Sequence, residues 1–185
     1  IGTYLWGAQV EQLPMATSYI PTTSVTVTRN ADVLTYPTAG IVDTTKGTVY
    51  LEVTPGFDIP NSNTDGYGKN YFLDFNFDRG FCGVINNKLY FHDGSGAYTL
   101  SPNFIPIRNV TYKVGSRYGS MGQKNFLNGT AGTNTSFDGS INLGTNLSIG
   151  KYGTNNAAQW GGWIKNVKIW KKALTDSKII QLQNS

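Results

Sequence analysis

The chain has 185 residues, of which 39% are hydrophobic and only 14% are charged, and its one cysteine excludes an internal disulfide. A chain of this length can bury a core without covalent or metal staples. The formal net charge of +4 is modest and the basic residues are scattered outside the C-terminal region, so neither a nucleic-acid-binding stripe nor a membrane-crossing segment is expected.

Alternation of apolar and polar residues predicts β-strands along most of the chain. In residues 47–54, GTVYLEVT, the side chains of Val49, Leu51 and Val53 fall on one face. The stretch YFLDFNFD predicts a second strand, and strict alternation divides it between two faces, Tyr71, Leu73, Phe75 and Phe77 against Phe72, Asp74, Asn76 and Asp78. Each strand therefore has one face suited to a core.

Residues 81–93, FCGVINNKLYFHD, predict a hairpin that turns at Asn86-Asn87, because asparagine tolerates the positive φ of a type I′ turn. In this register Val84 faces Leu89, Gly83 faces Tyr90 and Cys82 faces Phe91. Cys82 is then a small core residue and not a nucleophile.

The second half continues with strands in the stretches KNFLNGTAG, NLSIGKY and WIKNVKIW, the first of them ending in an Asn128-Gly129 turn. The tail differs, since Thr175 can cap a helix over DSKIIQLQ whose apolar stripe is Ile179, Ile180 and Leu182. The prediction is an all-β protein, an antiparallel β-sandwich with one short C-terminal helix.

The run from Asn125 to Leu182 resembles the concanavalin A-like, laminin-G-like jelly roll. NFLNGT is similar to a hairpin of that family, LSIGKY to one of its strands, and WGGWIKNVKIWKKALTDSKIIQL to its closing strand and helix. One departure is Lys178, where the family commonly has a capping-box glutamate. The resemblance implies a jelly roll of the concanavalin A-like lectin and glucanase type.

The N-terminal stretch YLWGAQVEQLPMATSYIPTTSVTVTRNADVL is similar to a junction between β-domains in bacteriophage tail and virion proteins. On this resemblance residues 1–23 are a lead-in strand and linker from a preceding domain, and residues 24–185 are the laminin-G-like domain. The resemblance also implies localisation in the virion and assembly as a homotrimer within a tail fibre.

The four tryptophans raise the question of core against binding platform. Trp170 occupies a position that is aromatic in the family pattern, and we expect it to be structural. Trp160 lies among small and polar residues, so it either stacks on sugar rings or folds over the end of the sandwich as a lid. The role of Trp163 is left open.

These features predict a non-catalytic domain that binds host cell-surface glycans through its rim loops. Aromatic rings would stack on sugars, and amides or a carboxylate would form hydrogen bonds with hydroxyls. The candidate ligand-binding residues are Asp65, Tyr67, Tyr118, Tyr152, Asn155 and Trp160.

Two alternatives remain at this stage. A glycan depolymerase would need carboxylates facing one groove, and Glu52, Asp74 and Asp78 are the candidates. A purely structural trimerisation or decoration module would instead bury Trp160 between subunits.

No cofactor is expected to be required, although one metal site is a candidate. The spacing of Asn61, Asn63 and Asp65 in NSNTDG is that of the first ligands of a calcium loop. The twelfth position is Phe72 where such loops have a glutamate.

Overall fold

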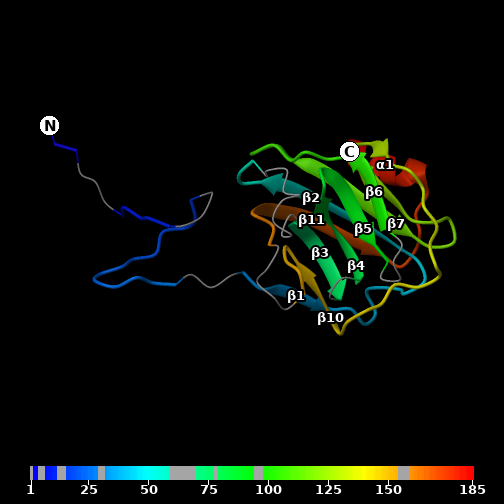
Figure 1. The fold of residues 1–185 in the computed structure, drawn as a ribbon, viewed down its shortest axis with the longest axis horizontal. Coiled ribbons are helices and arrows are strands. Elements are labelled where there is room, and N and C mark those ends of the chain that lie inside the picture. Colours follow the sequence, from blue (N-terminus) through cyan, green and yellow to red (C-terminus); the bar gives the residue numbers. More distant parts are fainter. Residues whose placement is uncertain are drawn as a thin grey trace.

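The computed structural model describes residues 2–3, 7–11, 16–28, 32–58, 70–76, 79–93, 98–153 and 159–185. These residues form eleven strands and one helix (Figure 1). The strands are β1 (Leu34–Pro37), β2 (Gly47–Pro55), β3 (Asn70–Asn76), β4 (Arg79–Ile85), β5 (Lys88–His92), β6 (Tyr98–Asn103), β7 (Tyr112–Tyr118), β8 (Lys124–Leu127), β9 (Thr130–Ala131), β10 (Asn146–Ile149) and β11 (Gly162–Trp170). The helix is α1 (Asp176–Asn184).

The strands are arranged in two stacked sheets, which we call sheet A and sheet B (Figure 1). Sheet A has the order β1-β10-β3-β4-β5-β6, and sheet B has the order β11-β2-β7-β8-β9. Every neighbouring pair is antiparallel. The fold is therefore the predicted all-β jelly-roll sandwich with one short C-terminal helix.

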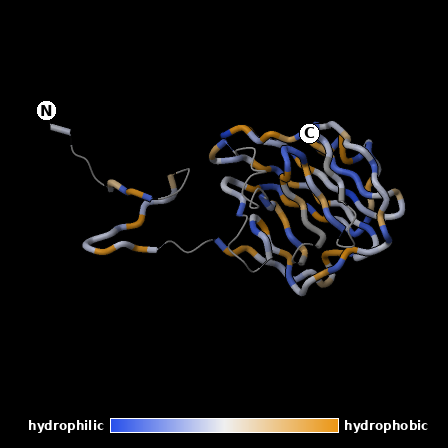
Figure 2. The backbone as a smooth tube through the Cα atoms, in the orientation of Figure 1, coloured by the Kyte–Doolittle hydropathy of each residue, from blue (hydrophilic) through white to orange (hydrophobic). Residues whose placement is uncertain are grey.

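The core lies between the two sheets and is built by the alternation that the sequence displays. Val49, Leu51 and Val53 of β2 are buried, as predicted, and they belong to one cluster with apolar residues of sheet A. Burial of each such side chain contributes about 1.5–3 kcal/mol. In Figure 2 hydrophobic and hydrophilic segments alternate along the strands, as expected for strands with one buried face.

Both predicted hairpin turns are confirmed. Asn86 and Asn87 have φ of 54° and 56°, and Asn128 and Gly129 have φ of 46° and 82°. The strands β4 and β5 pair in the predicted register, with Val84 opposite Leu89 and Cys82 opposite Phe91. Cys82 is buried, and burial raises the pKa of its thiol to about 12. The thiol is therefore protonated at neutral pH, and Cys82 is a core residue and not a nucleophile.

The predicted alternation of β3 is wrong at its start. The pairing of β3 with β4 shifts between Tyr71 and Leu73, which is a β-bulge that adds one residue to β3. Phe72 joins Leu73 and Phe75 in the core, whereas Tyr71 is outside the core cluster. A period-two pattern cannot place both Phe72 and Leu73 inside, so the bulge was not predicted.

Helix α1 covers the outer side of β7 and β8 near the C-terminus (Figure 1). Thr175 is its N-cap and accepts a hydrogen bond from the backbone N–H of Lys178, as predicted. Its buried residues are Ile179 and Gln183, while Ile180 and Leu182 are half-buried, so the predicted apolar stripe is only partly right. Gln183 is buried because its amide donates to the carbonyls of Lys113 and Phe126 at 2.9 and 3.1 Å.

Residues 7–11 and 16–28 contain no strand or helix and extend away from the sandwich (Figure 1). This segment exposes Val25 and Val27. The division of the chain at residues 23 and 24 stays a prediction. In the described part of the chain no helix is long and apolar enough to cross a membrane.

Candidate functional site

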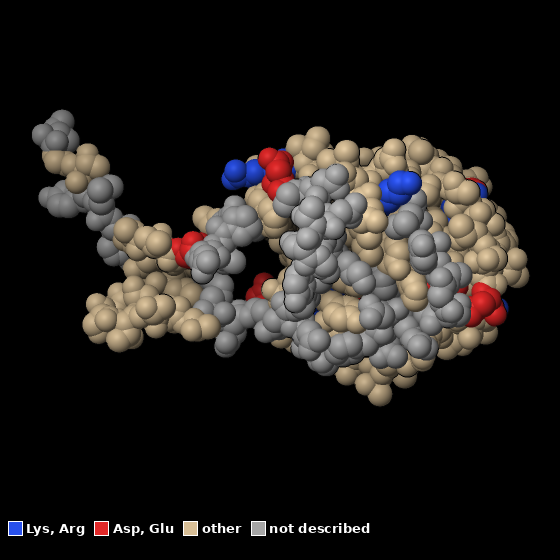
Figure 3. Space-filling view, in the orientation of Figure 1, with Lys and Arg blue, Asp and Glu red and all other residues tan. Residues whose placement is uncertain are grey.

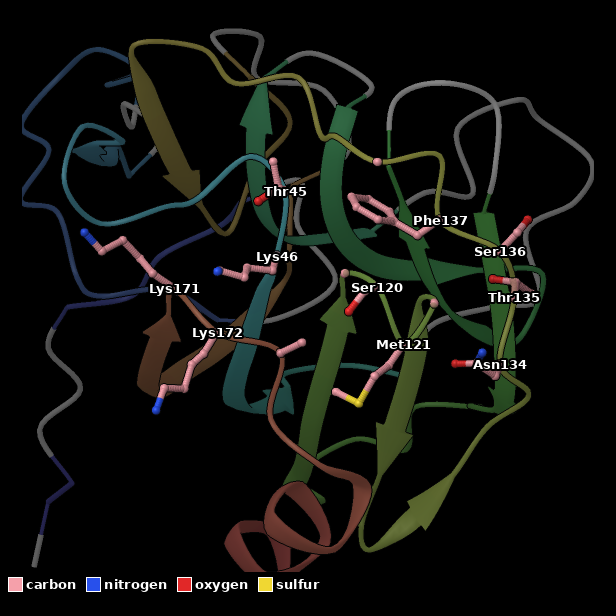
Figure 4. A pocket seen from close by; sticks show the side chains of 14 residues that line it. Thr45, Lys46, Ser120, Met121, Asn134, Thr135, Ser136, Phe137, Lys171 and Lys172 are labelled. Atoms are coloured by element: carbon pink, nitrogen blue, oxygen red, sulfur yellow. The ribbon is translucent and has the colours of Figure 1, made fainter.

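An open groove of about 1120 Å³ lies at one end of the sandwich, and we call it the end groove (Figure 4). Four segments that are distant in sequence form it: the approach to β2, the β7–β8 loop, the chain between β9 and β10, and the link from β11 to α1. They meet there because β2, β7, β8 and β11 are members of one antiparallel sheet. The lining residues are Thr45, Lys46, Gly119, Ser120, Met121, Gly122, Asn134, Thr135, Ser136, Phe137, Gly139, Lys171, Lys172 and Ala173.

Two glycines allow the β7–β8 loop to lie close to the neighbouring segments. A Cβ on Gly119 would lie 3.1 Å from Cβ of Lys46 and 3.3 Å from Cβ of Ala173. A Cβ on Gly122 would lie 2.5 Å from the carbonyl oxygen of Thr135. Both residues also have positive φ, 144° and 80°, which side chains disfavour. Glycine is therefore required for this part of the groove.

Tyr118 does not line the end groove but packs behind two segments that form it. The prediction that it lies on a rim loop is wrong: it is the last residue of β7 and is only 1% exposed. Its ring stacks on Phe91 and also contacts the ring of Phe137, with both centroid distances 5.6 Å. Its hydroxyl donates to the carbonyl of Asp43 at 2.6 Å, which fixes the approach to β2. Alternation at the end of a strand, next to Gly119, gave no sign of this burial.

A cluster of charged residues holds Asn134 in the wall of the groove. Arg117, only 4% exposed, donates one guanidinium N–H to Oδ1 of Asn134 at 3.1 Å and forms an ion pair with Asp176. Lys124 forms a second ion pair with Asp176 at 2.8 Å. The start of α1 is thereby tied to the groove wall, and a fixed amide needs less ordering when a ligand binds.

The next residue of the wall is fixed as well. Backbone hydrogen bonds of 2.9 Å run in both directions between Gln123 and Thr135. The hydroxyl of Thr135 is hydrogen-bonded to that of buried Thr99 at 2.6 Å. The segment from Asn134 onward is therefore joined to both sheets, since Thr99 belongs to sheet A and Gln123 directly precedes β8 of sheet B.

Asp176 makes part of the stability dependent on pH. Burial opposes ionisation of this carboxyl, but the bond from Lys124 and the charge of Arg117 outweigh it, so its pKa lies below the ordinary 3.8. Because the pKa is lower in the folded state, the resulting stability is fully present above about pH 4 and is lost as the pH falls through the folded value.

Replacing Asp176 with asparagine is expected to lower the free energy of unfolding at pH 7 by about 1 kcal/mol, a modest value because the side chain is 39% exposed and screened. Urea denaturation at pH 7 and at about pH 3 measures it. The gap between wild type and variant should shrink at the lower pH. A gap of equal size at both would contradict the ion-pair account.

The structure places Trp160 inside, as the lid interpretation predicted. It is 7% exposed, and its ring meets that of Phe72 edge-on, with centroids 4.8 Å apart at 85°. Its indole N–H donates to the carbonyl of Trp163 at 3.3 Å. Trp163 itself is 56% exposed, which answers the question left open. A platform formed by the Trp160 ring is not available in this structure.

Tyr152 is half-buried beside β3, with its ring 4.9 Å from that of Tyr71, and its role in binding stays a prediction. Neither Tyr152 nor Trp160 lines the end groove. The other candidate ligand-binding residues, Asp65, Tyr67 and Asn155, lie outside the described residues, as do the calcium candidates Asn61 and Asn63. Within the described residues no group of three or more His, Cys, Asp or Glu is arranged to hold a metal.

Two of the carboxylates of the depolymerase alternative, Glu52 and Asp74, belong to different sheets. Glu52 is in β2 of sheet B and Asp74 is in β3 of sheet A, so the two strands are not neighbours and the expectation that these two carboxylates face one groove is wrong. Glu52 lies between the core residues Leu51 and Val53, so it is on the outer side of sheet B. Asp74 is only 1% exposed, and its carboxylate accepts a hydrogen bond from the backbone N–H of Gly153 at 2.7 Å. Asp78 lies outside the described residues.

Glu52 is held in a network of its own on the outer side of sheet B. It accepts hydrogen bonds from Asn166 at 2.9 Å and from the hydroxyl of Tyr50 at 3.0 Å, and pairs with Lys165 at 3.4 Å. The bond from Asn166, with those from Tyr50 and Lys165, holds its pKa below the usual range. Burial and the Glu52 carboxylate raise the pKa of Tyr50 to about 12. These contacts hold Glu52 in one position and give it a structural role between β2 and β11.

Comparison with known proteins gives structural matches only: no family model and no curated protein matches the sequence. A pentraxin from Limulus polyphemus superposes with a TM-score of 0.55 and 17% identity over 76% of this chain and 70% of its own. Domain 4 of an extracellular GH43 arabinanase from Geobacillus stearothermophilus, in complex with arabinotriose, has a TM-score of 0.54 and 18% identity over 78% and 69%.

A CBM40 domain of a sialidase from Ruminococcus gnavus, bound to α2,3-sialyllactose, has a TM-score of 0.57 and 15% identity over 76% of this chain and 83% of its own. Several other matched chains are longer, and this chain covers only 22% to 37% of their length. At these identities the likeness shows the fold, and the function has to be argued from the residues of this chain.

Proposed function

We propose that this chain is a non-catalytic carbohydrate-binding domain and that the end groove is its binding site. The observation that supports this most directly is the composition of the groove. The groove is lined by hydroxyl and amide side chains that can bond to sugar hydroxyls and by the ring of Phe137, on which the C–H face of a sugar can stack. The polar residues are Thr45, Ser120, Asn134, Thr135 and Ser136.

The size and openness of the groove favour an oligosaccharide. Its volume of about 1120 Å³ exceeds what a single sugar fills, and an open groove can admit several linked sugars. The part of its lining that the structure describes contains no aspartate or glutamate. Since a glycosidase normally uses a pair of carboxylates, the lining favours binding over hydrolysis.

The proposal extends to the setting of the domain. On the sequence resemblance of the N-terminal stretch we propose a tail or other appendage of a bacteriophage virion, where the domain binds glycans of the host surface and assembles as a homotrimer. Two of the structural matches are domains that were solved with saccharides bound, which is in keeping with the carbohydrate part of the proposal. Burial of Trp160 within one chain leaves the purely structural alternative without its main residue.

Replacing Phe137 with alanine tests the site. Screening the purified chain against glycan arrays and bacterial surface polysaccharides should give saturable binding, which the variant weakens about tenfold because a stacked ring contributes about 1–1.5 kcal/mol. Product analysis after long incubation should show no shortening of the polysaccharide.

The matched control is Tyr36→Ala, which removes an aromatic ring that is 48% exposed on β1, away from the groove. It should bind as the wild type does. Thermal unfolding of both variants checks that they are folded, since the ring of Phe137 also contacts Tyr118. Equal binding by wild type and Phe137→Ala, or release of shorter saccharides, would contradict the proposal.

A further inference from the structure

Three lysines line one side of the end groove. Lys46 directly precedes β2, and Lys171 and Lys172 directly follow β11. The two strands are antiparallel neighbours with Trp170 opposite Thr48, so the residues just beyond this pair lie side by side. Figure 4 shows the three lysines together on one side of the groove, with Asn134 to Phe137 on the other and Ser120 and Met121 between them.

The backbone beneath these lysines is fixed by a buried threonine. Thr48 is 0% exposed, and its hydroxyl donates to the carbonyl of Lys172 at 2.9 Å. The same hydroxyl accepts a hydrogen bond from the N–H of Leu174 at 2.9 Å. Lys171 and Lys172 therefore start from an anchored turn, although their side chains reach solvent.

The charges of the three lysines are not neutralised by the rest of the groove. Among the described residues that line the groove there are three lysines and no aspartate or glutamate. In the part of the chain that the structure describes, the ion pairs are formed by other basic residues, namely Arg117, Lys124 and Lys165. Lys46 also helps to hold the pKa of Asp43 down, after the larger effect of hydrogen bonds from Thr45, but forms no ion pair with it.

Charges elsewhere on the visible surface are spread out. On the face shown in Figure 3, Lys and Arg side chains are few and stand apart from one another. A concentration of like charge in a groove whose described lining has no carboxylate is unfavourable by itself, and an anionic ligand relieves it. A site for neutral sugars would not need this concentration of positive charge.

We propose that the end groove selects anionic glycans, with Lys46, Lys171 and Lys172 binding the carboxylate or phosphate groups of an acidic polysaccharide. This inference rests on the proposed carbohydrate-binding function and adds the class of ligand. The charged edge of the saccharide faces the lysines, while the C–H face of a sugar ring stacks on Phe137 on the opposite side. Nucleic acid is disfavoured, because three lysines in one groove make a short patch and not a continuous track along a phosphate backbone.

The experiment compares polysaccharides that differ only in charge. Polygalacturonate and its full methyl ester form the carboxylate pair, and phosphorylated and plain dextran form the phosphate pair. By biolayer interferometry the intact chain is expected to bind at least one acidic member about tenfold more tightly than its neutral partner. This preference should fall as the salt concentration rises, because salt screens exposed charges.

Substitutions separate charge from stacking. Lys171→Gln with Lys172→Gln should weaken binding of the acidic member about tenfold and of the neutral member less than about twofold. Lys46→Gln should have the same selective effect with a smaller magnitude, while Phe137→Ala should weaken both members. The matched control, Lys88→Gln with Lys178→Gln, removes two exposed lysines outside the groove and should change neither.

Each outcome decides between the two proposals. If Phe137→Ala weakens both members of a pair and the lysine variants weaken neither, carbohydrate binding stands and the selection of anions is overturned. If poly-L-glutamate or an oligothymidylate binds as tightly as the acidic polysaccharide, charge alone is responsible and the inference is overturned. If the wild type binds no polysaccharide, the proposed function and the inference both fail.

Discussion

Replacing Trp160 with alanine is expected to lower the free energy of unfolding by about 3–5 kcal/mol. The ring is 7% exposed, belongs to the core cluster and meets Phe72 edge-on. Alanine would remove these contacts and leave a cavity beside β3 that the sheets cannot close. Urea denaturation measures the change. The dependence of the free energy of unfolding on urea concentration should stay constant, because the surface exposed on unfolding is nearly the same in both proteins.

Trp163 provides the matched control for this prediction. It is the same residue type three positions away, and it is 56% exposed. Trp163→Ala should change the free energy of unfolding by less than about 0.5 kcal/mol, as is usual for exposed positions. The carbonyl that accepts the Trp160 indole bond belongs to the backbone and is retained in this variant.

Binding measurements complete the test, because the sequence leaves two roles open for Trp160. The folded fraction of Trp160→Ala should bind glycan as the wild type does, since Trp160 does not line the end groove. A variant that kept full stability and lost glycan binding would contradict the buried position and support a stacking platform instead.

The strands and turns could be predicted because their signals are local. The type I′ turn at Asn86-Asn87 needs two residues that tolerate positive φ, and the sequence shows them between alternating strands. The register of the hairpin then follows by counting, which is why the burial of Cys82 was predicted correctly. The same holds for the Thr175 cap.

Features that depend on the pairing of distant strands were missed. The bulge at Phe72 is invisible to a period-two pattern, because it exists only relative to β4. The separation of Glu52 from Asp74 follows from which sheet each strand joins, and local alternation does not encode this.

The end groove was missed for the same reason, although part of its signal was visible. Lys171 and Lys172 stood out as part of a basic group near the C-terminus, but Lys46 is more than a hundred residues away in sequence. Two glycines, Gly119 and Gly122, bracket the β7–β8 loop and were a further sign of close packing. Only the order β11-β2-β7-β8 brings these pieces to one place.

Replacing Asn125 with alanine is expected to lower the free energy of unfolding by about 2–4 kcal/mol, because buried polar groups would lose their partners. Asn125 is 0% exposed in β8 of sheet B. Its amide donates to the carbonyls of Leu89 and Thr99, both at 3.0 Å and both in sheet A, and its oxygen accepts from the hydroxyl of Ser116 at 2.7 Å. One side chain thus links the two sheets.

The contrast with an exposed asparagine isolates this effect. Asn146→Ala, on the exposed side of β10, should change the free energy of unfolding by less than about 0.5 kcal/mol. The combined variant with Asn125→Ala and Ser116→Ala should lose less than the sum of the two single losses. Asn125→Ala removes the acceptor of the Ser116 hydroxyl, and Ser116→Ala then removes that hydroxyl.

The hydrogen bonds of Asn125 are connected to the end groove through Thr99, so the stability of the protein and its binding of glycan should change together. Thr99, whose carbonyl accepts from Asn125, is hydrogen-bonded through its hydroxyl to Thr135 in the groove wall. Loosening of β6 in Asn125→Ala should therefore weaken glycan binding by the folded protein, as measured by interferometry at a temperature well below unfolding. Unaltered binding in a destabilised but folded variant would show that the Gln123–Thr135 backbone bonds and the Arg117–Asn134 bond hold the wall without the contact to Thr99.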